Sequence, residues 1–98
     1  MSNKQYYVYI MTNITNNVLY TGVTNDLIRR IYEHKFHNGS HFTHKYKTTK
    51  LVYYEILNSA NEAINREKQI KNLVRRKKIT LINQLNSNWN DLYQEINM

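Results

Sequence analysis

The stretch Tyr20–His34, YTGVTNDLIRRIYEH, determines how the rest of this chain is arranged. It reads as the end of a β-strand, a glycine that lets backbone approach closely, and then a helix. Thr24 or Asn25 is placed to cap that helix, and Asp26 in its first turn suits the positive end of the helix dipole. The turn from strand to helix therefore brings a tyrosine, an arginine and a histidine to one corner of the molecule, which we take as the candidate site.

The helix predicted after this turn has an apolar stripe formed by Leu27, Ile28 and Ile31, and the next positions of this stripe fall near His34 and Lys35. Arg30 and His34 are four residues apart, so they share one side of the helix, beside the buried face. Each also has a simpler interpretation. His34 would then be an edge histidine with a local hydrogen bond, and Arg30 a solvated surface charge.

Three segments have the composition of β-strands. Residues 6–11 and 18–23 flank the turn-forming stretch TNITNN, which predicts an antiparallel hairpin, and residues 50–57, KLVYYEIL, predict a third strand. Apolar side chains occur at both alternating sets of positions in 6–11, so both faces of this strand are expected to be covered. With the helices, the prediction is an α+β fold, a three-stranded mostly antiparallel sheet flanked by helices in the order β-β-α-β-α-α.

A second helix is predicted from Ala60, after a capping box formed by Ser59 and Glu62. Its apolar stripe also contains one carboxylate, because the helical period gives Ala63, Ile64, Glu67, Ile70 and Val74.

An inward-facing carboxylate such as Glu67 has to be paired, protonated or bound to a cation. The structural alternative to a metal site is an ion pair with Arg66, with Lys71 or with an arginine of the first helix.

Four consecutive cations, Arg75 to Lys78, follow at the expected end of this helix. They are placed either to complement the negative helix terminus or to hold phosphates. A further helix is predicted around residues 79–85, and a short helix over residues 87–97 is expected to anchor the C-terminus through Trp89, Leu92 and Tyr93.

Composition restricts the class of protein. The 98 residues fit one domain, residues 1–98, with a core over about residues 5–83. No cysteine is present, which excludes disulfides and thiolate zinc sites, and the apolar run near the N-terminus is too short to span a membrane. We therefore expect a cytoplasmic protein. The 14 Lys and Arg against seven Asp and Glu give a net charge of +7, which favours a polyanion such as nucleic acid as partner.

The segment of residues 36–49, FHNGSHFTHKYKTT, combines histidines, lysines and aromatic residues. It lacks the helical histidine spacing and the carboxylates of a closed zinc site. Contact of a basic, aromatic loop with a phosphate backbone or a displaced base is the more economical hypothesis.

Taken together, the pattern resembles the GIY-YIG nuclease superfamily, in particular small stand-alone bacterial members related to the nuclease domain of the excision-repair protein UvrC. The two half-motifs resemble Tyr7-Val8-Tyr9 and Tyr20-Thr21-Gly22, the helix DLIRRIYEH matches the one that carries the arginine and histidine, and AINREKQIKNL matches the one that carries the glutamate. Tyr7 replaces the glycine of the first half-motif, and Val23 replaces the lysine that UvrC-like domains have after the second.

The resemblance implies a divalent-metal-dependent endonuclease acting on DNA, in repair or recombination. It implies that Glu67 holds one Mg²⁺ or Mn²⁺ ion, that Tyr9 or Tyr20 is the general base, and that Arg30 and His34 complete the catalytic set. Cations expected to contact DNA are Arg29, Lys45, Lys47, Lys71, Arg75, Arg76 and Lys78.

Two other functions remain possible from the sequence, a non-catalytic nucleic-acid-binding module and a protein-interaction domain with a tyrosine-rich surface. For a chain of this size, specificity would come from a protein partner, a homodimer or DNA shape.

Overall fold

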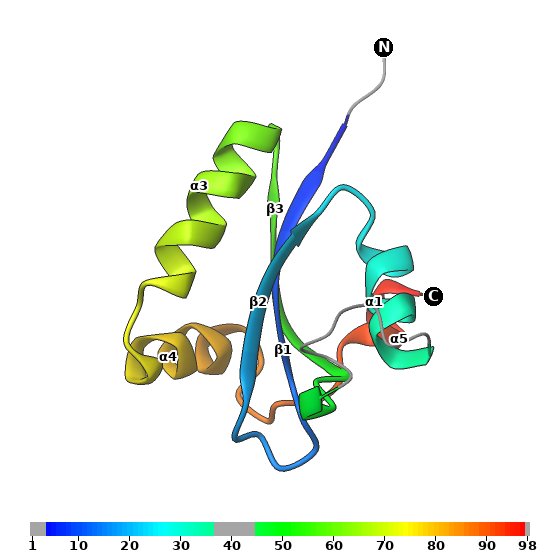
Figure 1. Ribbon diagram of the computed structural model, residues 1–98, viewed down its shortest axis with the longest axis vertical. Coiled ribbons are helices and arrows are strands. Elements are labelled where there is room, and N and C mark those ends of the chain that lie inside the picture. The colour runs from blue at the N-terminus through cyan, green and yellow to red at the C-terminus, as the bar shows by residue number, and fades with distance from the viewer. Residues whose placement is uncertain (1–3, 37–44, 98) are drawn as a thin grey trace.

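The fold is that of a computed structural model, in which residues 4–36 and 45–97 are described. Three strands, β1 (Tyr6–Thr12), β2 (Leu19–Thr24) and β3 (Lys50–Leu57), form one antiparallel sheet in the order β2-β1-β3 (Figure 1). The hairpin, the third strand and the α+β class predicted from the sequence are thus confirmed. The central strand β1 pairs on both sides, so its alternating side chains point into two separate layers.

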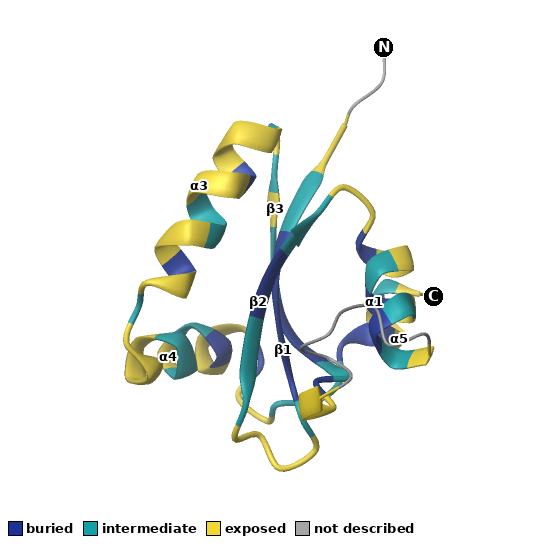
Figure 2. Ribbon diagram, in the orientation of Figure 1, coloured by how far each residue is buried: buried dark blue, intermediate teal, exposed yellow. Residues whose placement is uncertain are grey.

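Helices cover both faces of the sheet (Figure 1). On one face lie α1 (Leu27–Phe36) and α5 (Tyr93–Ile96), and on the other lie α3 (Ala60–Lys71) and α4 (Arg75–Leu85). Val8 and Ile10 pack with the α3–α4 layer, whereas Tyr9 and Met11 pack with the α1–α5 layer. Figure 2 shows the result, a buried central strand between helices whose outer surfaces are exposed.

Helix α1 begins one residue later than the predicted caps allow. Its cap is Asp26, whose Oδ1 accepts a hydrogen bond of 3.2 Å from the backbone N–H of Arg29. The hydroxyl of Thr24 does not cap the helix, because it accepts a hydrogen bond of 3.1 Å from the N–H of Asp26, which precedes the helix. The prediction of Thr24 or Asn25 as the cap was therefore wrong, while the Ser59 cap of α3 is confirmed by its bond of 3.1 Å from the N–H of Glu62.

The predicted second helix is divided in two. Helix α3 ends at Lys71, and Asn72 follows as its cap, with its N–H directed to the carbonyls of Ile70 and Lys68. Val74 then takes an extended conformation and is 58% exposed, so it is not part of the apolar stripe as predicted. The basic run Arg75–Lys78 consequently lies at the start of α4, at the positive end of a helix, and cannot complement a negative terminus.

The C-terminal segment also differs from the prediction, because only Tyr93–Ile96 is helical and not residues 87–97. Residues before it bind the beginning of β3 instead. Leu92 N–H donates to the carbonyl of Leu51 over 2.7 Å, and the Asn86 side chain donates to the carbonyl of Val52 over 3.1 Å. Because these bonds hold the segment of residues 86–92 against strand β3, the segment does not continue as a helix. No helix within residues 4–36 and 45–97 has the length and apolar character needed to cross a bilayer.

Candidate functional site

The aromatic ring of Tyr9 lies directly over Gly22. The two residues are opposite each other in the β1–β2 ladder, so their side chains belong on the same face of the sheet. A Cβ atom at Gly22 would come within 2.4 Å of both Cζ and the hydroxyl oxygen of Tyr9. Glycine is therefore required here for the close approach of a side-chain ring, whereas the sequence indicated a close approach of backbone.

Tyr9, Tyr20 and His34 form one cluster. Ring centroids are 6.3 Å apart for the two tyrosines, 5.8 Å for Tyr9 and His34, and 5.3 Å for Tyr20 and His34. Tyr9 is 1% exposed, whereas Tyr20 is half-buried. Of the two phenols, Tyr20 is thus the more accessible to solvent.

The hydroxyl of Tyr9 is held from two sides by residues of α1. It is 3.2 Å from Nε2 of His34, and Arg30 hydrogen-bonds to it as well. Because a guanidinium has only donors, the Tyr9 oxygen accepts from Arg30, which leaves the phenol proton for Nε2 of His34. Burial, together with the charges of Tyr20 and Glu67, outweighs the effect of Arg30 and raises the pKa of Tyr9 to about 12.

His34 is fully buried, at 0% exposure, and is part of the inner face of α1 with Leu27 and Ile31. The prediction that it lies beside the buried face was therefore wrong. Burial, and secondarily the positive charge of Arg30, lowers the pKa of His34 to about 4. The ring is thus neutral near pH 7, as an acceptor for the Tyr9 hydroxyl has to be.

Arg30 is bound on its other side by a residue that the sequence analysis did not identify. Its Nη1 donates to Oε1 of Glu33 over 3.1 Å, and Arg29 lies 3.9 Å from the same carboxylate. Burial acts to lower the pKa of Arg30, but the hydrogen bonds to Tyr9 and Glu33 outweigh it, so the pKa is raised. The signal in the sequence was the spacing of three and four residues between these arginines and Glu33.

Glu67 reaches the site from the opposite layer. Its side chain is 16% exposed, and Oε2 lies 3.1 Å from Nζ of Lys71, one helical turn further along α3. Arg66 does not compete for it, because Nε and Nη2 of Arg66 each bind Glu55 over 2.9 Å. Of the ion pairs predicted for Glu67 as an alternative to a metal site, the one with Lys71 is present and the one with Arg66 is not. The charge of Glu67 contributes to the raised pKa of Tyr9, less than burial and less than the charge of Tyr20.

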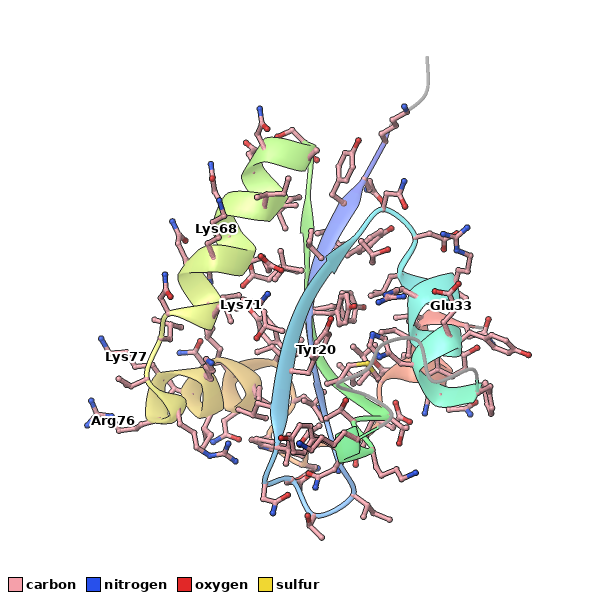
Figure 3. All side chains as sticks on the ribbon, viewed as in Figure 1. Tyr20, Glu33, Lys68, Lys71, Arg76 and Lys77 are labelled. Atoms are coloured by element: carbon pink, nitrogen blue, oxygen red, sulfur yellow. The ribbon has the colours of Figure 1, made fainter. Side chains whose placement is uncertain are left out.

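The five predicted residues thus come from both sides of the sheet. In Figure 3, Tyr20 lies between α1, marked by Glu33, and the α3–α4 pair, marked by Lys68, Lys71, Arg76 and Lys77. Arg76 and Lys77 project from the start of α4 away from the sheet (Figure 3).

The cations expected to contact DNA do not all lie together. Arg29 is on α1, whereas Lys71, Arg75, Arg76 and Lys78 are on the α3–α4 pair. Arg75 binds the carbonyl of Asn16 in the hairpin loop over 3.2 Å.

Lys45 and Lys47 are exposed, and Nζ of Lys45 is 5.3 Å from the centre of the Tyr46 ring. The three histidines of residues 37–44 lie outside the described residues, so the interpretation of that loop is untested.

The donor set at Glu67 fits Mg²⁺ or Mn²⁺. No three His, Asp or Glu side chains of the described chain gather as a metal-binding group. Magnesium nevertheless needs only one or two carboxylates in proteins, since it retains several waters and binds substrate phosphates. One carboxylate such as that of Glu67, whose side chain is 16% exposed, meets this requirement.

Comparison with known proteins identifies the family. The GIY-YIG catalytic domain family matches residues 5–80. The chain belongs to this family. In the GIY-YIG domain the half-motifs lie on β1 and β2, where the register pairs Tyr9 with Gly22 and Met11 with Tyr20. The resemblance found in the sequence is therefore confirmed.

Relatives of similar length share almost the whole GIY-YIG chain. A UPF0213 protein of Clostridium perfringens is 38% identical over 92 residues, which cover 94% of this chain and 98% of the relative. One of Staphylococcus saprophyticus is 35% identical over 80 residues, covering 82% and 96%. The solution NMR structure of a UPF0213 protein from Bacillus halodurans has 32% identity and a TM-score of 0.57, and covers 89% of this chain and 92% of its own.

The packing of Tyr9 on Gly22 gives a prediction about the stability of the GIY-YIG core. Gly22→Ala should lower the free energy of unfolding by about 2 kcal/mol, because the new methyl group overlaps the Tyr9 ring. Urea unfolding measures the change. The control is Tyr9→Ala, alone and combined with Gly22→Ala. If the clash is the cause, the double variant loses less stability than the two single losses added together, whereas strict additivity would refute it.

Proposed function

We propose that the protein is a cytoplasmic, divalent-metal-dependent endonuclease that hydrolyses DNA phosphodiester bonds, in repair or recombination. The observation that carries the proposal is one cluster formed by Tyr9, Tyr20, Arg30 and His34. The charge of Glu67 also contributes to the raised pKa of Tyr9 in this cluster. Family membership supports a nuclease. Each residue of the cluster has a proposed role in that reaction.

Tyr20 is the better candidate for the general base. The raised pKa of Tyr9 and its 1% exposure make that phenol a poor proton acceptor for a water molecule. In our proposal Tyr9 is a positioning residue, held by His34 and holding Arg30 in turn. The half-buried phenol of Tyr20 takes the proton from the attacking water.

Arg30 is proposed to neutralise the scissile phosphate. Its bonds to Tyr9 and Glu33 fix the guanidinium, so less side-chain entropy is lost when it binds an oxygen of the phosphate. A divalent ion held by Glu67 would supply Lewis-acid stabilisation of developing negative charge. The neutral His34 orients Tyr9 and carries no charge to the site near pH 7.

The direct test is cleavage of a panel of flapped, branched, single-stranded and duplex DNA. Protein with Mg²⁺ or Mn²⁺ is expected to nick at least one of these, and excess chelator should stop the reaction. Inertness over the whole panel with both metals would overturn the endonuclease proposal.

A non-catalytic nucleic-acid-binding module is the second candidate. The Lys71–Glu67 ion pair favours this candidate, because Lys71 occupies the carboxylate that would hold the metal in the endonuclease. It would bind DNA without metal and would be indifferent to substitution of Glu67. A protein partner or a second copy of the chain that supplies specificity remains part of either proposal.

The start of α4 provides a prediction about DNA binding. The positive side chains of Arg75–Lys78 lie at the positive end of the α4 dipole, which is unfavourable. Bound phosphates would neutralise these charges and relieve the repulsion. The double variant Arg76→Ala, Lys77→Ala is expected to weaken DNA binding and to reduce the slope of log affinity against log salt by up to about two. Fluorescence anisotropy at several salt concentrations measures both.

Lys4→Ala serves as the control for that experiment, because Lys4 is an exposed lysine just before β1 and does not belong to the α3–α4 pair. It should leave the salt slope nearly unchanged. If both variants change the slope equally, the effect reflects net charge alone and the assignment of α4 is wrong.

A further inference from the structure

The carboxylate of Glu67 has a specific cationic neighbour. Lys71 lies one helical turn further along α3, with Nζ 3.1 Å from Oε2 of Glu67. The two side chains differ in burial, since that of Glu67 is 16% exposed and that of Lys71 is 52% exposed. The acid is thus fixed within the protein, whereas the ammonium group approaches it from solvent on a flexible stem.

The other basic residues near Glu67 do not replace Lys71. Arg66 is committed to Glu55 by two hydrogen bonds of 2.9 Å, and Lys68 has no ion pair among the described residues. Within the described part of the chain, Lys71 is therefore the cation that neutralises this carboxylate. It is also the last residue of α3, next to the break before α4, and its side chain is 52% exposed.

We propose that Lys71 and a divalent cation are alternative partners of Glu67, so that Lys71 sets how tightly the site binds metal. This inference rests on the proposed function, which assigns the metal to Glu67. An ammonium 3.1 Å from the ligand oxygen occupies one of its lone pairs and would repel a doubly charged ion at the same oxygen. Binding of the metal therefore requires Lys71 to leave, and the lost ion pair reduces the net affinity.

The exchange makes Lys71 more than a static surface charge. A lysine that leaves the carboxylate remains close to the site, because it is only four residues from the metal ligand. Its release is then linked to metal binding, and linkage is reciprocal, so anything that holds Lys71 away from Glu67 also tightens metal binding.

Titration of the intact protein with Mn²⁺ tests the proposal, with free Mn²⁺ followed by electron paramagnetic resonance. Lys71→Met keeps most of the aliphatic stem and is expected to tighten Mn²⁺ binding about threefold or more. Lys71→Gln should change it in the same direction. Lys68→Met is the matched control, a neighbouring lysine of α3 without an ion pair among the described residues, and it should change the affinity less than twofold.

Glu67→Gln separates the two proposals in the same titration. If wild-type protein binds Mn²⁺ and this variant does not, the metal site stands. Unchanged or weaker binding by both Lys71 variants then overturns the exchange alone. If Mn²⁺ binding is absent, or does not depend on Glu67, the metal-dependent function and the exchange both fail.

Discussion

Glu67→Gln is expected to lower kcat/KM for DNA nicking by about a thousandfold. The substitution keeps the size of the side chain and removes its charge, so the carboxylate that would hold the divalent ion is lost. That side chain is 16% exposed, and its charge contributes to the raised pKa of Tyr9. Initial rates on the best substrate of the DNA panel, at saturating Mg²⁺, give the comparison.

Glu62→Gln provides the matched control, since Glu62 is an exposed glutamate in the first turn of the same helix. Its activity should stay within about twofold of wild type. Circular dichroism and thermal unfolding establish that both variants are folded. A Glu67→Gln protein that is folded and retains a tenth of the wild-type rate would show that this carboxylate is not the metal ligand.

The second large effect concerns stability in acid. His34 has its pKa lowered by burial to about 4, from an ordinary value of 6.5. Above pH 6.5 the ring is neutral in both folded and unfolded chains and makes no difference. As the pH falls below 6.5, His34 takes up a proton in the unfolded chain but not in the folded protein. The free energy of unfolding therefore decreases until about pH 4. The full loss is about 3 kcal/mol.

Urea unfolding between pH 7.5 and 4 measures this loss, and His34→Gln isolates it. Glutamine does not titrate, so the free energy of unfolding of the variant should change less between pH 6.5 and pH 4. At pH 7.5 the variant should be less stable than wild type, because a packed ring has been removed. Carboxylates titrate alike in the two proteins. Parallel curves would mean that His34 titrates normally in the folded state.

Local patterns predicted the parts of the fold that depend on local interactions. The β-favouring runs gave three strands, and Ser59 capped α3 as its spacing to Glu62 indicated. The division between α3 and α4 could not be read from the chain, since no glycine or proline marks it and the helical period continues through Val74. The helix predicted over residues 87–97 was wrong for residues 87–92, because the bonds of Leu92 and Asn86 to β3 are tertiary contacts that local patterns do not reveal.

The site shows the same distinction. The spacing of Arg30 and His34 indicated that they share a side of the helix, and the glycine at position 22 indicated a close approach. The helical period placed the next positions of the apolar stripe near His34 and Lys35, but His34 was expected beside the buried face and not within it. Tyr9 is the reason it can be buried, since the phenol supplies a partner for Nε2.

The assembly of the site from both layers of the sheet has a consequence for biosynthesis. Tyr9, Tyr20, Arg30 and His34 leave the ribosome well before α3, whose Glu67 lies on the opposite side of β1 and β2. A nascent or truncated chain that ends before this helix would therefore have the phenols and the arginine but no cutting activity. The proposed nuclease would be harmless to the genome until its polypeptide is two-thirds made.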